Sequence, residues 1–350
     1  GWSLPFGVLA VAVVTVFYAW VGGLRSVVWV DVLQLGVYVL GGVATLIVAT
    51  NLAGGLESFG RAWDAGKLAV VDPSPSFNTT YTLWGGLIGG ALLSAASHGT
   101  DHLIVQRLLA ARGLAEAKKA LVGSGVFVIV QFALFLLVGT SLWLAGGDRP
   151  GLAGDAIYPT FVVEHLPPGL AGLVVASILA AASVASALNS LASASTHDFY
   201  VSLTGRTDPR HLLRVGRAMT LLWAAVLVGG ALLVRERDTP VVVLALSIAS
   251  LTYGGLLGTY LLGGFWARAR ERDVIVAILV SVAAMTPVVL GTVIPQFPVR
   301  WLPGLAWPWY VPLGTGVTVA AGIASSLIGR ATADEATGVE TTAGKTPTIG

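Results

Sequence analysis

The stretch ALVGSGVFVIVQFALFLLVGTSLWLAGG, residues 120–147, contains no Asp, Glu, Lys or Arg. Residues 240–267 form a second stretch of this kind. A helix that crosses the hydrocarbon core of a bilayer needs about 20 predominantly apolar residues, and both stretches exceed that length. Because both faces of each stretch are apolar, neither suits the surface of a water-soluble protein. The two stretches therefore indicate an all-α protein that spans a membrane.

The composition of the whole chain agrees with this interpretation. Of the 350 residues, 55% are hydrophobic and only 11% are charged, whereas soluble domains carry about 25% charged residues. A soluble enzyme and a disordered protein are excluded. The net charge of +2 gives no reason to expect a nucleic-acid partner. The absence of cysteine excludes disulfides, thiolate metal sites and cysteine nucleophiles. No Ser/His/Asp arrangement or nucleotide-binding loop indicates catalysis, so we expect neither an enzyme nor an organic cofactor.

Hydropathy predicts a polytopic protein with about nine transmembrane helices. The predicted spans are residues 4–21, 27–51, 82–106, 120–145, 169–195, 213–234, 240–266, 274–294 and 309–329.

The charges between the spans predict an orientation. When the gaps between spans are taken alternately, one set contains fourteen basic residues and the other six. The richer set should be cytoplasmic, which places residue 1 outside, the C-terminal tail inside and the protein in the plasma (inner) membrane. Residues 331–350 are predicted to be a disordered cytoplasmic tail. Because the chain begins with Gly1 and apolar sequence follows at once, we expect a fragment of a longer protein.

Asp31 is the first ionisable residue inside a predicted span. Gln34 follows it on the same helix face. One interpretation is an interfacial carboxylate that reaches water or pairs with Arg25. The other is a carboxylate that attracts cations into an inner pathway.

The third span holds the densest polar cluster, and so many polar groups indicate function more than structure. Asp101 and Arg107 are too far apart for an i,i+4 pair, so each should have a partner on another helix. His98 and His102 are four residues apart, but the cluster lacks a metal-ligand set. The glycines at 85–86 and 89–90 would permit an unwound or kinked stretch that lines a cavity. The cluster comprises Ser94, Ser97, His98, Thr100, Asp101, His102, Gln106 and Arg107.

Two further spans carry polar residues. On the fifth span, a row of serines shares one helix face, beside Asn189. This row is either a close-packing seam or a line of oxygen ligands for Na⁺. The seventh span carries a weaker patch that helix packing explains. The row is Ser183, Ser186, Ser190 and Ser193; the patch is Ser247, Ser250, Thr252 and Tyr253.

Four stretches, in this order, resemble the motifs of the sodium:solute symporters. The family includes sodium/glucose, sodium/proline, pantothenate and iodide transporters. The stretches are GGLRSVVWVDVLQ (22–34), HGTDHLIVQRLLAARGLAEAKKA (98–120), AASVASALNSLASASTHDFY (181–200) and SLTYGGLLGTYLLGGFWARARER (250–272). The second is similar to the family's T-D-Q-x-x-V-Q-R signature, with His102 in place of the first Gln. The third is similar to its S-S-x-x-S-x-L-N-S run.

The resemblance implies a LeuT-like bundle of two inverted five-helix repeats, with solute and ion near the midplane beside broken helices. Residues 1–330 would form a transmembrane transporter domain that lacks the first three core helices. Within it, residues 4–51 would end the first repeat, 82–266 would form the second, and 274–329 would be accessory helices.

The resemblance also implies site residues. Two adjacent hydroxyl residues that bind Na⁺ in the family match Ala182 and Ser183, so one hydroxyl is absent, and a backbone carbonyl near Leu179 would be a further ligand. The inner-pathway carboxylate of the family matches Asp31. The remaining positions fall into two groups. Substrate-facing positions match Ser94, Ser97 and His98; structural or gating positions match Asp101, Gln106, Arg107 and Asn189.

The implied function is sodium-coupled symport of a small organic solute by alternating access, with the bilayer, Na⁺ and the solute as partners and Na⁺ as the only metal. The lysine of the sugar carriers falls near Val128, so we expect a smaller polar or anionic solute, with His98 as a donor. Proton coupling through Asp31, Asp101 or His98 is an alternative that Ala182 favours. A transporter-like sensor module is another. A channel has no filter-like motif to support it.

Overall fold

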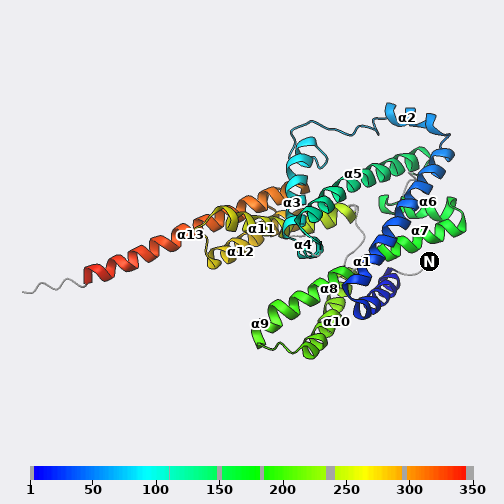
Figure 1. The fold of residues 1–350 in the computed structure, drawn as a ribbon. Coiled ribbons are helices and arrows are strands. Elements are labelled where there is room, and N and C mark those ends of the chain that lie inside the picture. The colour runs from blue at the N-terminus through cyan, green and yellow to red at the C-terminus, as the bar shows by residue number, and fades with distance from the viewer. Residues whose placement is uncertain are drawn as a thin grey trace, which may run out of the picture. The chain divides into compact units, whose positions relative to one another are not determined.

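The computed structural model describes residues 4–109, 111–147, 152–181, 185–233, 241–293 and 298–343. Every regular element in these ranges is a helix, which confirms the predicted all-α class. The chain divides into two compact units (Figure 1). The first comprises residues 1–69 and 106–238, and the second comprises residues 70–105 and 239–350.

The first unit is organised around the long helix α1, which contacts α5, α7, α8 and α10. A Cβ added to Gly41 on α1 would lie 2.6 Å from the Val174 side chain on α7, so glycine permits this close approach. Thr50 and Ser141 join α1 to α5 through a buried 3.2 Å hydrogen bond. The helices of this unit are α1 (Leu4–Leu52), η1 (Leu56–Ser58), α2 (Phe59–Asp64), α5 (Leu114–Leu144), α6 (Gly154–His165), α7 (Pro168–Ala181), α8 (Ala185–Ala194), the π-helical η3 (Ser195–Tyr200), α9 (Val201–Thr204) and α10 (Pro209–Leu233).

The second unit is a bundle of three long helices with a shorter polar helix against it. Each of α11, α12 and α13 contacts the other two, and α3 packs on α11. A Cβ on Gly254 would lie 2.8 Å from the Cα of Gly314, so α11 and α13 touch through their backbones. The helices of this unit are the π-helical η2 (Gly85–Gly90), α3 (Ala91–Thr100), α11 (Val241–Phe265), α12 (Glu271–Val293), the 3₁₀ turn η4 (Trp307–Trp309) and α13 (Tyr310–Ala343); α4 (His102–Leu109) begins here and ends in the first unit.

Among the described residues, six helices are long and apolar enough to cross a membrane, and each matches a predicted span. The predicted span 82–106 is divided in the structure, whereas the span 169–195 includes residues outside the described ranges. Residues 82–106 fold as η2, α3 and α4 in succession, and residues 169–195 contain α7 and α8. The six segments are Asp31–Leu52, Leu114–Leu144, Pro209–Leu232, Val242–Phe265, Glu271–Gly291 and Trp307–Ile328.

The structure differs from the sequence prediction at α1. The hydropathy pattern predicts two spans, 4–21 and 27–51, joined by a short loop, but the backbone is one helix of 49 residues. At 1.5 Å per residue its length is about 73 Å, more than twice the hydrocarbon thickness of a bilayer. Residues 22–26 contain two glycines but no proline. Glycine weakens a helix by about 1 kcal/mol per residue, whereas proline would end it.

Two predicted boundaries also differ from the observed elements. The predicted second repeat, residues 82–266, includes parts of both compact units, so the repeat assignment stays a prediction. Helix α13 continues to Ala343, into the segment 331–350 for which the sequence predicts disorder. Residues 331–343 contain no proline that would stop the helix.

Candidate functional site

The helix that carries the densest polar cluster is interrupted at Asp101. Helix α3 ends at Thr100 and α4 begins at His102, and Asp101 between them is extended, with φ −75° and ψ 120°. The Asp101 carbonyl accepts the N–H groups of Ile104 at 3.1 Å and Val105 at 2.9 Å, so it starts the hydrogen-bond pattern of α4. At membrane depth, backbone of this kind is tolerated only in protein or against a water-filled cavity. The break is therefore a candidate for a solute or ion site.

The three predicted substrate residues lie together one turn before the break. The Nδ1 atom of His98 is 2.9 Å from Ser97 Oγ and 3.0 Å from the Ser94 carbonyl oxygen. Ser97 Oγ also donates to the Ser94 carbonyl at 3.2 Å. Ser94 is exposed, while Ser97 and His98 are half-buried. The local bonds hold the imidazole against its own helix.

The proton on His98 decides what its other nitrogen offers. The Ser94 carbonyl can only accept, so a hydrogen bond to it requires the proton on Nδ1. A neutral ring then presents a lone pair at Nε2, and an imidazolium presents an N–H there. If Nδ1 instead accepts from Ser97, Nε2 carries the proton and is a donor.

Asp101 is bonded across the unit to α11. The hydroxyl of Tyr253 donates to Asp101 Oδ2 at 2.6 Å, a distance typical of a hydrogen bond to a charged carboxylate. The two residues are 152 positions apart in sequence. Asp101 thus has the partner on another helix that the sequence predicts. The bond fixes the interrupted turn to a long spanning helix.

Apolar packing places α3 beside α11 and α13. Ala96, on α3, is fully buried against Leu257 of α11 and Val311 of α13. Thr100 turns its hydroxyl back to the Ala96 carbonyl at 2.6 Å, so it is satisfied within α3. Small residues at this contact let the polar helix approach the bundle closely.

The other predicted residues lie in the first unit or outside the described part of the chain. Asp31 is half-buried at the beginning of the candidate span Asp31–Leu52. Asn189, on α8, is half-buried, and its Nδ2 atom has no hydrogen-bond partner among the described residues.

For five predicted site residues the structure describes no side chain. Ala182 and Ser183 lie outside the described residues. The backbones of Leu179, Gln106 and Arg107 belong to helices, but their side chains also lie outside what the structure describes. Their roles stay predictions.

Tyr253 is the residue that sequence reasoning missed. The sequence places it in a patch that helix packing explains, whereas its hydroxyl donates a hydrogen bond to Asp101. The available signal was its place in the stretch 250–272, one of the four that resemble the family motifs.

The chain is similar in sequence to known sodium-coupled transporters. The chain is 27% identical over 288 residues to the sodium/sialic acid symporter NanT of Aliivibrio fischeri, covering 79% of this chain and 57% of the relative. It is 28% identical over 317 residues to human sodium-coupled monocarboxylate transporter 1, covering 87% and 52%. It is 29% identical over 321 residues to a sodium/glucose cotransporter of Vibrio parahaemolyticus, covering 81% and 56%. The chain spans about half the length of these relatives.

A solved structure has the same fold. A Na⁺-coupled sialic acid symporter in a substrate-bound outward-open state superposes with a TM-score of 0.75 at 24% identity, covering 92% of this chain and 66% of that one. The model of the sodium:solute symporter family matches residues 1–281. The chain is therefore a multi-pass membrane protein that belongs to the sodium:solute symporter family.

Proposed function

We propose that this chain is part of a secondary active transporter that couples the entry of Na⁺ to the entry of a small organic solute. The observation that carries the proposal is the interruption of a polar helix at Asp101, beside three side chains that can bind a solute. Family membership and relatives named as sodium-coupled carriers support it.

The solute would bind at Ser94, Ser97 and His98. Two relatives are named for sialic acid and for monocarboxylates, and we infer that the solute here also carries a carboxylate. A protonated Nε2 of His98 would donate to it, and the Ser97 hydroxyl would do so on leaving the Ser94 carbonyl. A hydrogen bond to a charged group contributes about 1.5–3 kcal/mol, enough to select an anion over a neutral analogue.

Asp101 and Tyr253 would control the movement of the broken helix. Alternating access requires one group of helices to move against another around the binding site. A bond between the interrupted turn and α11 stabilises whichever state contains it, and only that state. We propose that breaking and remaking this bond accompanies the opening of the site, with Gln106 and Arg107 on α4 in the same gating segment.

Na⁺ would bind through Ser183 and the backbone carbonyl of Leu179. Ala182 contributes no side-chain ligand. The Ser183 hydroxyl would therefore contribute more to the selectivity for Na⁺ than either hydroxyl of the family's usual pair. Asp31 would attract the cation at the inner mouth of the pathway, and Asn189 would support α8 beside the site. In the proposed orientation, residue 1 is outside and the tail is in the cytoplasm of a cell whose plasma membrane holds the protein.

The first experiment measures the binding of radioactive Na⁺, competed by K⁺, to the purified full-length transporter of which this chain would be part, in detergent. Ser183→Ala should abolish saturable binding, and Ser202→Ala, at an exposed serine on α9, should not change it. Saturable binding that survives Ser183→Ala would remove this serine from the ion site. No saturable binding to the folded wild-type protein would overturn direct Na⁺ coupling.

Proton coupling on the same fold is the second candidate function, and the missing hydroxyl at Ala182 favours it. A proton-coupled carrier would accumulate solute in proteoliposomes under an inward pH gradient without Na⁺. A sodium-coupled carrier would require the Na⁺ gradient and would respond weakly to the pH gradient.

A further inference from the structure

The second unit contains a cavity of about 440 Å³, within the size range of small-molecule sites. It is lined by the loop residues 70–72 and 80–83, by residues of the π-helical turn η2, and by Trp307 and Pro308. In the orientation predicted from the basic residues, the loop 52–81 lies outside the cell. A ligand would therefore reach the cavity from the external solution.

The walls of this cavity are held by contacts between distant segments. The N–H of Ala306 donates to the Phe77 carbonyl at 2.9 Å, and the Phe77 ring packs on Trp309 with centroids 4.7 Å apart. The N–H of Leu83 donates to the Asp72 carbonyl at 2.7 Å, which closes the loop on itself. These bonds make the cavity a preformed feature of the unit.

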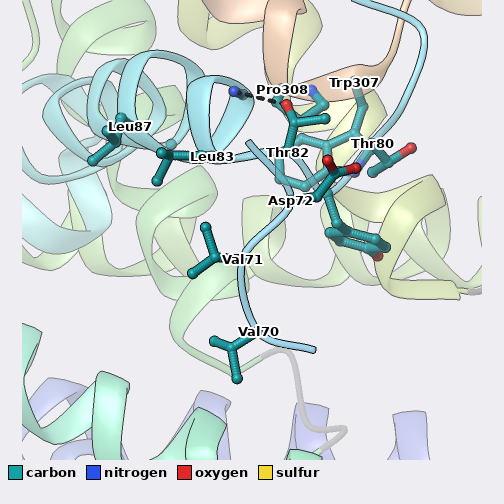
Figure 2. A pocket seen from close by; sticks show the side chains of 13 residues that line it. Val70, Val71, Asp72, Thr80, Thr82, Leu83, Leu87, Trp307 and Pro308 are labelled. Carbon is teal, nitrogen blue, oxygen red and sulfur yellow. Dashed lines mark hydrogen bonds between the residues drawn. The ribbon is translucent and has the colours of Figure 1, made fainter. Parts of the chain in front are cut away.

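The lining has a polar end and an apolar end. Figure 2 shows Asp72, Thr80 and Trp307 gathered at one end, while Val71, Leu83 and Leu87 lie toward the other. A complementary ligand has one polar group and an apolar body.

The polar end is anionic. Asp72 Oδ1 accepts the Ser74 N–H at 2.9 Å, and this bond holds the pKa of the Asp72 carboxyl below its ordinary value. Within the described part of the chain, Asp72 is paired with no basic side chain. Its charge is therefore available to a ligand.

Aromatic rings accompany the carboxylate. Tyr81 and Trp307 both line the cavity, and the Tyr81 side chain is 72% exposed. Rings of this kind attract cations through the negative potential of their faces, and trimethylammonium groups are favoured ligands of such arrangements. A carboxylate and two aromatic rings in one lining favour a cation over an anion or a neutral molecule.

Two glycines leave the helical wall of the cavity bare. A Cβ added to Gly86 or to Gly90 would meet no atom within 4 Å. Both residues line the cavity. A larger side chain at Gly86 would therefore occupy the space that a ligand needs without colliding with the protein.

We propose that this cavity binds a small organic cation, an ammonium ion with an apolar body, with Asp72 as its counter-ion and Tyr81 and Trp307 as its aromatic partners. The proposal does not depend on which solute is transported. It assigns a ligand of opposite charge to the one proposed for the cluster at His98.

The test uses the whole chain in nanodiscs and radiolabelled benzyltrimethylammonium, with empty nanodiscs as the background. Neopentylbenzene, the neutral isostere of the probe, serves as competitor. We expect saturable binding that Asp72→Asn weakens by about fivefold or more. Asp64→Asn, at an exposed carboxylate on α2 that does not line the cavity, should leave it unchanged.

A second pair of variants tests the place of binding. Gly86→Leu should abolish it, while Gly60→Leu, which also projects into open space, should not. Size-exclusion chromatography verifies that each variant is folded. If Gly86→Leu does not fold, the result for Asp72→Asn decides the outcome. Equal binding by Asp72→Asn and wild type, equal competition by the neutral isostere, or no saturable binding would each overturn the proposal.

Discussion

Removing the hydroxyl of Tyr253 gives the sharpest test of the interrupted helix. Tyr253→Phe keeps the ring, which is half-buried on α11, and deletes only the donor of the 2.6 Å bond to Asp101. A hydrogen bond to a charged group contributes about 1.5–3 kcal/mol. Asp101 has a further interaction in the structure and is only half-buried, so water can replace the lost donor. We therefore expect the lower part of this range, about 1.5–2 kcal/mol, which is about 10- to 30-fold in an equilibrium constant.

Two measurements show whether the bond stabilises one conformation of the transport cycle or the folded protein as a whole. If the bond forms in only one conformation, Na⁺-driven uptake should fall by up to about the same factor, because the balance of conformations shifts. If it persists throughout the cycle, uptake should hold and the thermal unfolding temperature in detergent should fall. Asp101→Asn keeps an acceptor for the tyrosine and should lose about half as much. The double variant should then show non-additive losses.

Tyr260→Phe is the matched control, because Tyr260 lies on the same helix with its side chain 65% exposed. It should change neither uptake nor unfolding temperature. If Tyr253→Phe behaves like this control in both assays, the bond to Asp101 contributes nothing and the gating proposal is wrong.

Two other predictions concern packing and solute binding. Gly258→Ala should destabilise the protein by about 1–3 kcal/mol, because its Cβ would meet Thr318 Cβ at 2.4 Å; Gly255→Ala, whose nearest neighbour is Ser281 Oγ at 3.7 Å, should be tolerated, and thermal unfolding in detergent compares the two. His98→Gln should raise the solute concentration for half-maximal uptake about tenfold through the loss of one charge-assisted bond. His102→Gln, at an exposed position on α4, should not, and equal effects of the two variants would contradict the assignment of His98.

The spanning helices were predictable because a helix in the bilayer requires a continuous run of apolar residues. Such a run can be recognised from neighbouring residues alone. The stretch 120–147 has no charge, and it folds as the greater part of α5. The cluster of Ser94, Ser97 and His98 was predictable for the same reason, since a spacing of three or four residues brings side chains together on any helix.

The position of the helix break was not predictable from local sequence. The glycines at 85–90 suggested where the third span would deform, and they do form a π-helical turn, yet the interruption itself lies at Asp101. The Asp101 carbonyl accepts the first hydrogen bonds of the new helix, and Tyr253 binds the Asp101 carboxylate. That partner is 152 residues away, and no periodicity in the sequence connects the two.

Because α1 is one continuous helix, the side of the membrane on which its N-terminal part lies does not follow from the positions of the later loops. In the orientation predicted from the basic residues, Gly7 faces the exterior if residues 4–21 and 27–51 cross the membrane separately. If α1 crosses once, that orientation places Gly7 on the cytoplasmic side, and the loops after Leu52 stay where they are. The chain contains no cysteine, so Gly7→Cys creates a unique thiol at a position where an added Cβ meets no atom within 4 Å. Labelling of that thiol by an impermeant maleimide in intact cells would decide between an odd and an even number of crossings.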